Sequence, residues 1–315
     1  MDFAIFVSAT RNYLPYLNAL LNSLERCGLN IPVYLIHTNL PPRYLDAATS
    51  AFTFPVNVVK VDRQQFDVHP RNRGNENLFS KQSRFKYLRE LGVRHDVVCL
   101  LDADMFVVSH NFLNLFKMVY GTPLLIGCNE RFKWVFDHRY TTKGQILFST
   151  PVRALKFHCS VPIIFDARKW QDVLDHYNWM AFQSFEVEDG EVKKPVGDIF
   201  CWNISVYKCG RQSDVVLFPM EVMTQVHDTA VRPMTRLQKW KGYWMTEAGD
   251  EVFSIHGRIG RKWFERGVIR AESLGLAQEE VERSKHVLQE VWKEWVSLNT
   301  DGRIDVREFV RIDVP

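Results

Sequence analysis

Two aspartates, Asp102 and Asp104, stand one residue apart in an otherwise apolar segment. The segment 97–108 is rich in Val and Leu and predicts a buried strand. An unpaired buried carboxylate is costly, and residues i and i+2 of an extended chain point the same way. We therefore expect both carboxylates to converge on one Mn²⁺ or Mg²⁺ ion, which would also bind phosphate oxygens. The alternative is a solvated turn at the strand end, where Asp favours the bend.

A second segment with chemical potential is 253–263, far downstream of the acid pair. It places His256 at the end of an apolar run, and Gly257, Gly260 and several cations follow, among them Lys262. A neutral imidazole suits Mn²⁺ as a further ligand, glycines let backbone approach a phosphate, and Arg and Lys neutralise its charge. Alone, this pattern is more typical of a surface loop. With the acid pair it favours a metal and phosphate site.

Strands and helices that must position these residues alternate along the chain. The predicted strands are 3–7, 33–37, 56–61, 97–108, 124–127, 161–165 and 215–218, and the predicted helices are 13–26, 81–91 and 276–296. This alternation predicts an α/β fold with a parallel sheet covered by helices on both faces. Ligands bind such sheets beyond the carboxyl ends of the strands. Ser8, Thr10 and the acid pair would meet there, whereas 182–194 is predicted to be an acidic loop.

Composition narrows the class of protein. The 315 residues are 46% hydrophobic and 24% charged, which is ordinary for a globular chain, and the net charge of +3 alone implies neither a nucleic-acid nor a membrane partner. The six cysteines lack CxxC spacing and favour reduced core thiols. No signal peptide or transmembrane span is expected. These features predict a cytoplasmic protein.

Four stretches together resemble one known group of enzymes. They are residues 8–24, Arg84 with the helix that precedes the acid pair, Asp102-Ala103-Asp104, and His256 with Lys262 six residues later. The chain resembles the GT-A-fold glycosyltransferases, specifically the family-eight retaining galactosyltransferase and glycogenin group. Weaker similarity through 159–170 and 197–203 extends the resemblance over most of residues 3–264. It implies a Rossmann-like mixed, mainly parallel sheet flanked by helices.

The resemblance also implies a role for each matched residue. The metal ligands would be Asp102, Asp104 and His256, holding Mn²⁺ or Mg²⁺. Contacts to the nucleotide and its diphosphate would come from Ser8, Thr10, Asn12, Tyr13, Arg84, Asp102, Ala103, Gly257 and Lys262. The catalytic residues would be Asp104 and Asp198, the latter as the carboxylate that faces the sugar. An N-cap of the following helix explains Asp198 equally well.

The sequence departs from the group at several positions. Ile199 and Phe200 stand where the group has Gln and Asp, at contacts to donor sugar and acceptor. Cys159 and Val161 fall where Asn and Gly are usual, and the Gly and Pro around Lys262 are shifted or missing. The chain is therefore predicted to be a divergent member.

The function that follows is metal-dependent, retaining transfer of a sugar from a nucleoside diphosphate sugar, UDP-linked, to a hydroxyl of a glycan or glycolipid. One alternative is a glycosyltransferase that modifies hydroxylated bases in DNA. Another is a non-catalytic carbohydrate- or protein-binding domain with the same fold. A sugar-1-phosphate nucleotidyltransferase would need a Gly-rich phosphate loop after the first strand, and residues 8–13 have none.

Two further clusters and the C-terminal region complete the predictions. An extension of the phosphate site is one interpretation of the basic set Arg71, Arg73, Lys81, Arg84 and Lys86, but we expect a solvated helix face for all of them except Arg84. An aromatic acceptor platform is one interpretation of Trp134, Phe136, Tyr140 and Trp179. The domain boundaries are 1–268 for the transferase domain and 269–315 for a helix and short hairpin packed on it. Residues 297–308 match an EF-hand loop in part, and we favour an Asp-Gly hairpin there.

Overall fold

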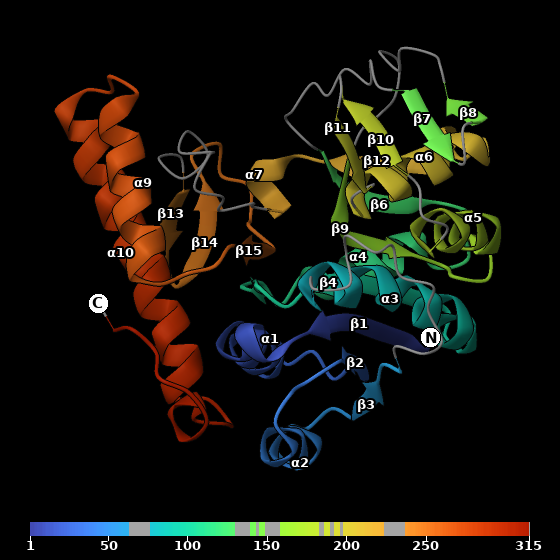
Figure 1. Cartoon of the computed structure of the whole chain (residues 1–315). Coiled ribbons are helices and arrows are strands. Elements are labelled where there is room, and N and C mark those ends of the chain that lie inside the picture. Colours follow the sequence, from blue (N-terminus) through green and yellow to red (C-terminus); the bar gives the residue numbers. More distant parts are fainter. Residues whose placement is uncertain are drawn as a thin grey trace.

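A mixed seven-stranded sheet forms the centre of the molecule (Figure 1). The computed structural model describes residues 1–62, 76–129, 139–142, 145–148, 158–182, 186–189, 192–195, 198–223 and 237–314. The strand order is β12-β6-β9-β4-β1-β2-β3. The strands are β1 (Phe3–Ala9), β2 (Val33–His37), β3 (Val56–Lys60), β4 (Val97–Asp102), β6 (Leu125–Asn129), β9 (His158–Phe165) and β12 (Val215–Phe218). Only β9 runs antiparallel to its neighbours, so the predicted mixed, mainly parallel sheet is confirmed.

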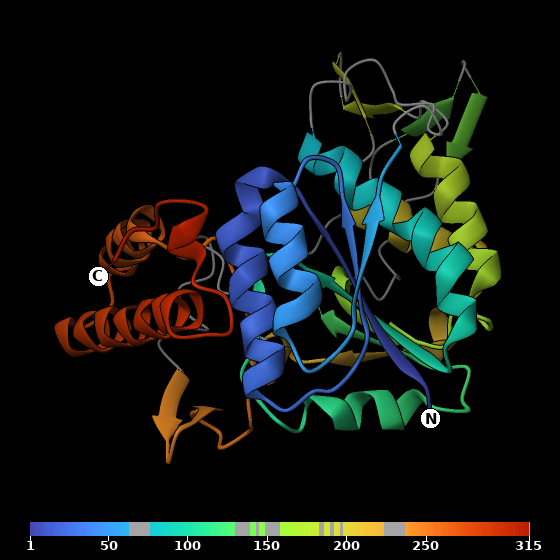
Figure 2. The same ribbon diagram turned by 90° about the horizontal axis from the view of Figure 1, so that it is seen from below.

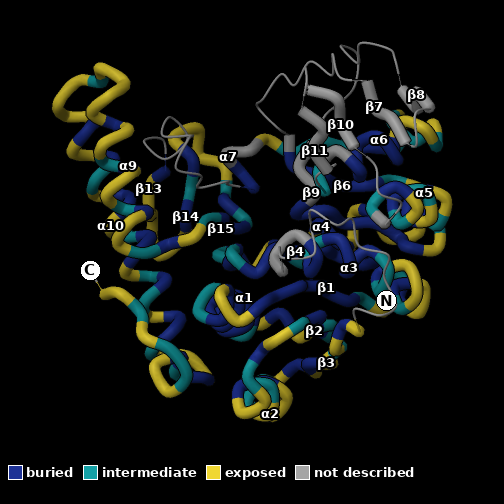
Figure 3. Tube along the Cα trace, viewed as in Figure 1, coloured by how far each residue is buried: buried dark blue, intermediate teal, exposed yellow. Residues whose placement is uncertain are grey.

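Helices cover both faces of this sheet. They are α1 (Leu14–Arg26), α2 (Pro42–Ala51), α3 (Glu76–Leu91), α4 (Phe112–Val119), α5 (Gln171–Phe182), α6 (Asp198–Lys208) and the short α7 (Met220–Met223). Figure 2 shows α1 and α2 on one side of the first strands and α3 on the other. The leucines of α1 recur at helical spacing and are all buried, which is why this segment packs as an amphipathic helix. Figure 3 shows the central strands buried and the outer surface of α2 exposed.

Smaller sheets flank the central one. They are formed by β5 (Met105–Val107) with β15 (Ser254–His256), by β13 (Leu237–Trp240) with β14 (Tyr243–Thr246), and by β7 (Arg139–Thr142), β8 (Gln145–Phe148), β10 (Glu186–Asp189) and β11 (Val192–Pro195). The prediction of a loop over 182–194 was wrong, because β10 and β11 pair there as an antiparallel hairpin. Their polar sequence contains no apolar run of the kind that identifies a core strand.

The C-terminal region is a helical pair packed on α1. The helices α9 (Arg261–Ser273) and α10 (Gln278–Thr300) share a second core with buried tryptophans, and a 3₁₀ turn follows at Val306–Glu308. Trp295 of α10 packs against Tyr16 of α1, with ring centroids 5.7 Å apart. The boundary predicted at residue 268 falls inside α9. No helix in the described part of the chain combines the length and the apolar character needed to cross a bilayer.

The predicted Asp-Gly hairpin near the C-terminus was also wrong. The α10 helix runs to Thr300, and Asp301 caps it, its backbone N–H donating to the Ser297 carbonyl. No strand occurs in the described residues 301–314. The buried face of α10 continues through Leu298 and Asn299, so the chain is still helical where the hairpin was expected to begin.

Candidate active site

The acid pair lies where β4 ends at the carboxyl edge of the sheet. Asp102 is the last residue of β4, Ala103 and Asp104 form a turn, and the chain continues into β5. The two acids therefore do not share one extended strand, and the turn that we held as the alternative is the local structure. It is buried instead of solvated, with Asp102 only 3% exposed.

His256 reaches the acid pair through the small sheet of β5 and β15. In this antiparallel ladder His256 is the partner of Met105, and the backbone N–H of Gly257 donates to the Asp104 carbonyl at 2.8 Å. Pairing of two short strands far apart in sequence thus brings the imidazole to the carboxylates. The sequence predicted this meeting from spacing and resemblance alone.

The three side chains form one compact donor set. His256 Nε2 lies 3.1 Å from Asp104 Oδ1 and 3.7 Å from Asp102 Oδ2. One ligand atom from each of the three residues lies within 4.8 Å of the other two, and all three residues are buried. His256 Nδ1 is also buried and has no hydrogen-bond partner among the described residues. Two carboxylate oxygens and an imidazole nitrogen suit Mn²⁺ or Mg²⁺, so these residues fit a divalent ion.

Electrostatics hold this set in its ionised form. Burial opposes ionisation of Asp102, but Lys81, Arg84 and His256 outweigh it and hold its pKa far below the usual range. Burial likewise opposes ionisation of Asp104, and His256 lowers its pKa despite that. Burial lowers the pKa of His256, yet the two carboxylates raise it overall. Opposite charges within a few ångströms therefore dominate over desolvation at each group.

Two cationic side chains of α3 bind the carboxylate of Asp102. The fully buried Arg84 donates to Asp102 Oδ1, and Lys81 Nζ lies 2.7 Å from Asp102 Oδ2. Arg84 Nη2 also lies 3.5 Å from Asp198 Oδ2, at the first residue of α6. Arg84 thus links the acid that ends β4 to the acid that begins α6. Asp198 is both a helix-start residue and a neighbour of the acid pair.

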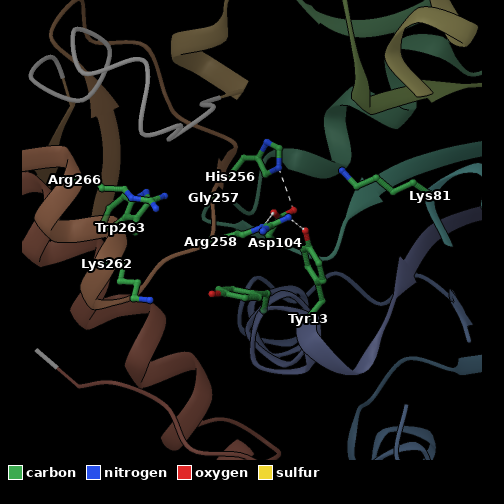
Figure 4. Close-up of a pocket in the computed structure, with 10 residues that line it drawn as sticks. Tyr13, Lys81, Asp104, His256, Gly257, Arg258, Lys262, Trp263 and Arg266 are labelled. Atoms are coloured by element: carbon green, nitrogen blue, oxygen red, sulfur yellow. Dashed lines mark hydrogen bonds and ion pairs between the residues drawn. The ribbon is translucent and has the colours of Figure 1, made fainter. Parts of the chain in front are cut away.

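A cavity of about 550 Å³ opens beside the donor set. Its lining combines three aromatic rings, four cations, one glycine and two residues of the donor set: Tyr13, Tyr16, Lys81, Asp104, His256, Gly257, Arg258, Lys262, Trp263 and Arg266. Figure 4 shows Lys81 on one side of Asp104 and His256, with Lys262 and Arg266 on the other. The guanidinium of Arg258 lies over the Tyr13 ring, 4.9 Å from its centroid, and donates to the Tyr13 hydroxyl. The cavity therefore combines positive charge with aromatic rings.

A smaller recess adjoins the cavity at the ends of β1 and β4. It is lined by Ser8, Ala9, Thr10, Tyr13, Ser80, Lys81, Asp102, Ala103 and Asp104. Ser8 is the ladder partner of Asp102, which is why the parallel strands bring these positions together. Ser8 Oγ is buried and has no hydrogen-bond partner in the described ranges. The polar ends of two neighbouring strands thus face one recess.

No family model and no curated protein matches the sequence. An active-site mutant of LgtC matches 89% of this chain over 99% of its own length, with a TM-score of 0.55 and 17% identity. Galactosyltransferase LgtC in complex with donor and acceptor sugar analogs has the same coverage, with a TM-score of 0.52 and 14% identity. The apo bifunctional glycosyltransferase WbbM matches 90% of this chain at a TM-score of 0.52 and 15% identity, and the chain spans 51% of its length.

The chain has the GT-A fold. At these identities the likeness concerns the fold, and it confirms the predicted fold class.

Most predicted site residues meet on this GT-A fold. The acid pair, Ala103, His256, Gly257, Lys262, Ser8, Thr10 and Tyr13 line the cavity or its recess. Arg84 and Asp198 adjoin the site through Asp102. Asn12 is the exception: it is exposed and lines neither space.

Lys81 is the residue that sequence reasoning misplaced. We predicted a solvated helix face, whereas its ammonium is bound to Asp102 and lines both spaces. Lys81 shares a helix face with Arg84, because residues i and i+3 lie on one side of a helix, but this spacing alone does not distinguish a lysine paired with a buried acid from a solvated one. Tyr16, Arg258 and Arg266 were not singled out as site residues, and they too line the cavity.

Other predicted clusters receive no support from the described chain. Arg71, Arg73, Trp134 and Phe136, and the side chain of Tyr140, lie outside the described residues. Trp179 lies on α5, 43% exposed, and lines neither the cavity nor the recess. The acceptor platform therefore stays a prediction.

Proposed function

We propose that this chain is a metal-dependent, retaining glycosyltransferase that moves a sugar from a nucleoside diphosphate sugar, UDP-linked, to a hydroxyl acceptor. The observation that carries the proposal is the convergence of Asp102, Asp104 and His256. Asp104 and His256 line a cavity that Lys262 and Arg258 also line, and Asp102 lines the adjoining recess. An acid-rich metal site beside a cation-rich cavity matches a ligand that carries both a metal-binding diphosphate and excess negative charge.

The cavity supports donor binding by size and by chemistry. A volume of about 550 Å³ lies in the range that small-molecule ligands occupy. Lys262, Arg258 and Arg266 would neutralise the diphosphate, and the rings of Tyr13 and Tyr16 offer faces for stacking. These residues would fix the donor before any bond changes.

Asp102, Asp104 and His256 would hold Mn²⁺ or Mg²⁺ through two carboxylates and an imidazole. When bound, the ion would act as a Lewis acid that stabilises the charge on the leaving diphosphate. Lys262 would add a positive charge to the same group. Arg84 would keep Asp102 ionised and oriented, since it donates directly to one oxygen of that carboxylate.

Asp198 would face the donor sugar. Its carboxylate lies against Arg84, 3.5 Å from Nη2, and Arg84 in turn contacts Asp102. A carboxylate there would stabilise positive charge at the anomeric carbon, which becomes oxocarbenium-like as the bond to phosphate breaks. The acceptor would be the hydroxyl of a glycan or glycolipid. A DNA acceptor stays a prediction, without support from the site.

A hydrolysis screen tests the proposal directly. The protein is incubated with a panel of nucleotide sugars, with Mn²⁺ or with EDTA, and release of nucleoside diphosphate is measured. We expect release from a UDP-sugar only with the metal, and calorimetry should show tighter UDP binding in its presence. Metal-independent or absent UDP binding, with no turnover, would favour the non-catalytic binding domain.

A further inference from the structure

Lys81 and Arg84 lie one turn apart on α3, and each binds a different carboxylate oxygen of Asp102. Arg84 takes Oδ1, and the Lys81 ammonium takes Oδ2 at 2.7 Å. Oδ2 is also the oxygen that lies 3.7 Å from His256 Nε2. The ammonium therefore sits on the oxygen that Asp102 turns toward the rest of the donor set.

The ammonium of Lys81 binds the oxygen of Asp102 that a metal ion would need, so its role is not only to orient that carboxylate. An ion held jointly by Asp102 and His256 would use Oδ2, the oxygen that Lys81 already binds. Two cations at one carboxylate oxygen repel each other strongly in a buried site. Lys81 therefore competes with a divalent ion for Oδ2.

The side chain of Lys81 has space to move away from Asp102. Its side chain is 31% exposed, whereas Arg84 is fully buried, and it lines both the recess and the cavity. A lysine is a point charge on a flexible four-carbon stem, so its ammonium can reposition while its backbone stays on α3. The cavity it borders is the one in which we place the donor diphosphate.

We propose that Lys81 is a tethered cation that competes with the divalent ion for Asp102 and turns to the donor diphosphate once displaced. The inference rests on the proposed function, which supplies the ion and the diphosphate. Without donor, Lys81 weakens metal binding. With donor, the diphosphate offers its ammonium a new anionic partner, so metal and donor bind cooperatively, and the coupling is reciprocal.

The test is Mn²⁺ binding to the whole chain, followed by the electron paramagnetic resonance signal of free Mn²⁺, with and without UDP. We expect Lys81→Met to bind Mn²⁺ alone about tenfold more tightly than the wild type. UDP should then tighten Mn²⁺ binding by a smaller factor in the variant than in the wild type. Lys86→Met, on the same helix but lining neither space, is the matched control and should behave as wild type.

A second variant of Lys81 keeps the test valid if Lys81→Met fails to fold. Lys81→Gln keeps a hydrogen-bond donor for Asp102 but removes the charge, and it should also bind Mn²⁺ more tightly; circular dichroism checks the fold of both variants. Equal or weaker Mn²⁺ binding by folded Lys81 variants would overturn the inference and leave the metal site standing. Absence of Mn²⁺ binding in every protein, with or without UDP, would overturn the proposed function and the inference with it.

Discussion

Two of the buried polar clusters in the described part of the chain join distant segments and differ in how completely their atoms are hydrogen-bonded. One is the charged site around Asp102 and His256. The other is an amide cluster where α1 meets α10 and the C-terminal segment. There Asn18 Nδ2 donates to Asn299 Oδ1 and to the Ile304 carbonyl, both at 3.1 Å, and the Tyr44 hydroxyl donates to Asn18 Oδ1.

The amide cluster pairs both polar atoms of Asn18 within the protein. In the charged site, by contrast, Ser8 Oγ and His256 Nδ1 are buried without hydrogen bonds among the described residues, and a cavity adjoins them. Buried polar groups are normally paired because an unpaired one costs free energy. Asn18 is thus satisfied within the protein, while the charged site has unpaired polar atoms where we propose that a ligand binds.

The largest effect should follow from Asp104→Asn, which tests the charged site. The change keeps the shape of the side chain and removes one carboxylate from the metal ligands, so we expect turnover to fall on the order of 10³-fold. Thermal unfolding should change little, because the amide can still hydrogen-bond to His256. Nucleotide-sugar hydrolysis with Mn²⁺ and a melting curve measure the two effects.

The control for this prediction is Asp46→Asn, a change at an exposed position of α2. It should leave both turnover and melting unchanged. Unchanged turnover in the Asp104 variant would remove Asp104 from the mechanism and place the charged site among structural clusters.

Sequence pattern predicted the elements of the core well. The apolar run at 97–102 and the leucines of α1 follow the periods of a buried strand and an amphipathic helix, because those segments are decided by burial. The spacing of Asp102, Asp104 and His256 likewise predicted a metal site, since few apolar segments contain ionisable side chains that have no charged or metal partner.

The remaining features depend on tertiary pairing that no local pattern reveals. Lys81 was assigned to solvent because a lysine that pairs with a buried acid and a solvated lysine have the same helical spacing. Gly302 was assigned to a hairpin because Asp-Gly is a strong turn signal. It is instead packed against Asn22, a contact between residues of distant segments.

A smaller effect is expected from Asn18→Ala, which breaks the amide cluster. The change removes the Asn18 partner of Asn299 Oδ1 and of the Tyr44 hydroxyl, while the Ile304 carbonyl keeps Asn22 Nδ2 at 3.4 Å. It should cost about 2–4 kcal/mol of stability. Urea denaturation measures the loss, with Asn57→Ala on the exposed surface of β3 as the control. Turnover per folded molecule should stay at the wild-type level. A loss of turnover without loss of stability would contradict the division between the clusters.

Gly302→Ala should disturb the same cluster less. A Cβ at this position would meet the Asn22 side chain well inside van der Waals contact, and overpacking of this kind costs about 1–3 kcal/mol. A double-mutant cycle with Asn22→Ala isolates the clash, because the smaller side chain makes room for the methyl group. Additive losses of stability in the cycle would show that the two residues do not compete for space.

The smallest effect concerns Glu25, at the exposed border of the amide cluster. Its carboxylate accepts from Thr53 N at 3.0 Å and from Arg303 Nε at 2.9 Å. Although burial opposes ionisation, the hydrogen bonds with Thr53 and Arg303 and the charge of Arg303 lower the pKa of Glu25 below its ordinary value of 4.5. A lowered pKa in the folded state stabilises the protein above pH 4.5, and this contribution disappears as the pH falls through the lowered value.

Glu25→Gln should therefore lower stability at pH 7 by at most about 1 kcal/mol, because Arg303 is more than half exposed and solvent screens the pair. Urea denaturation at several pH values measures the difference between variant and wild type. The difference should shrink as the pH falls below 4.5, because the protonated wild-type side chain then carries no charge either. A difference that persists unchanged in acid would assign the effect to lost hydrogen bonds with Thr53 instead of lost charge. The border of the amide cluster would then be held together as its interior is, by neutral pairing.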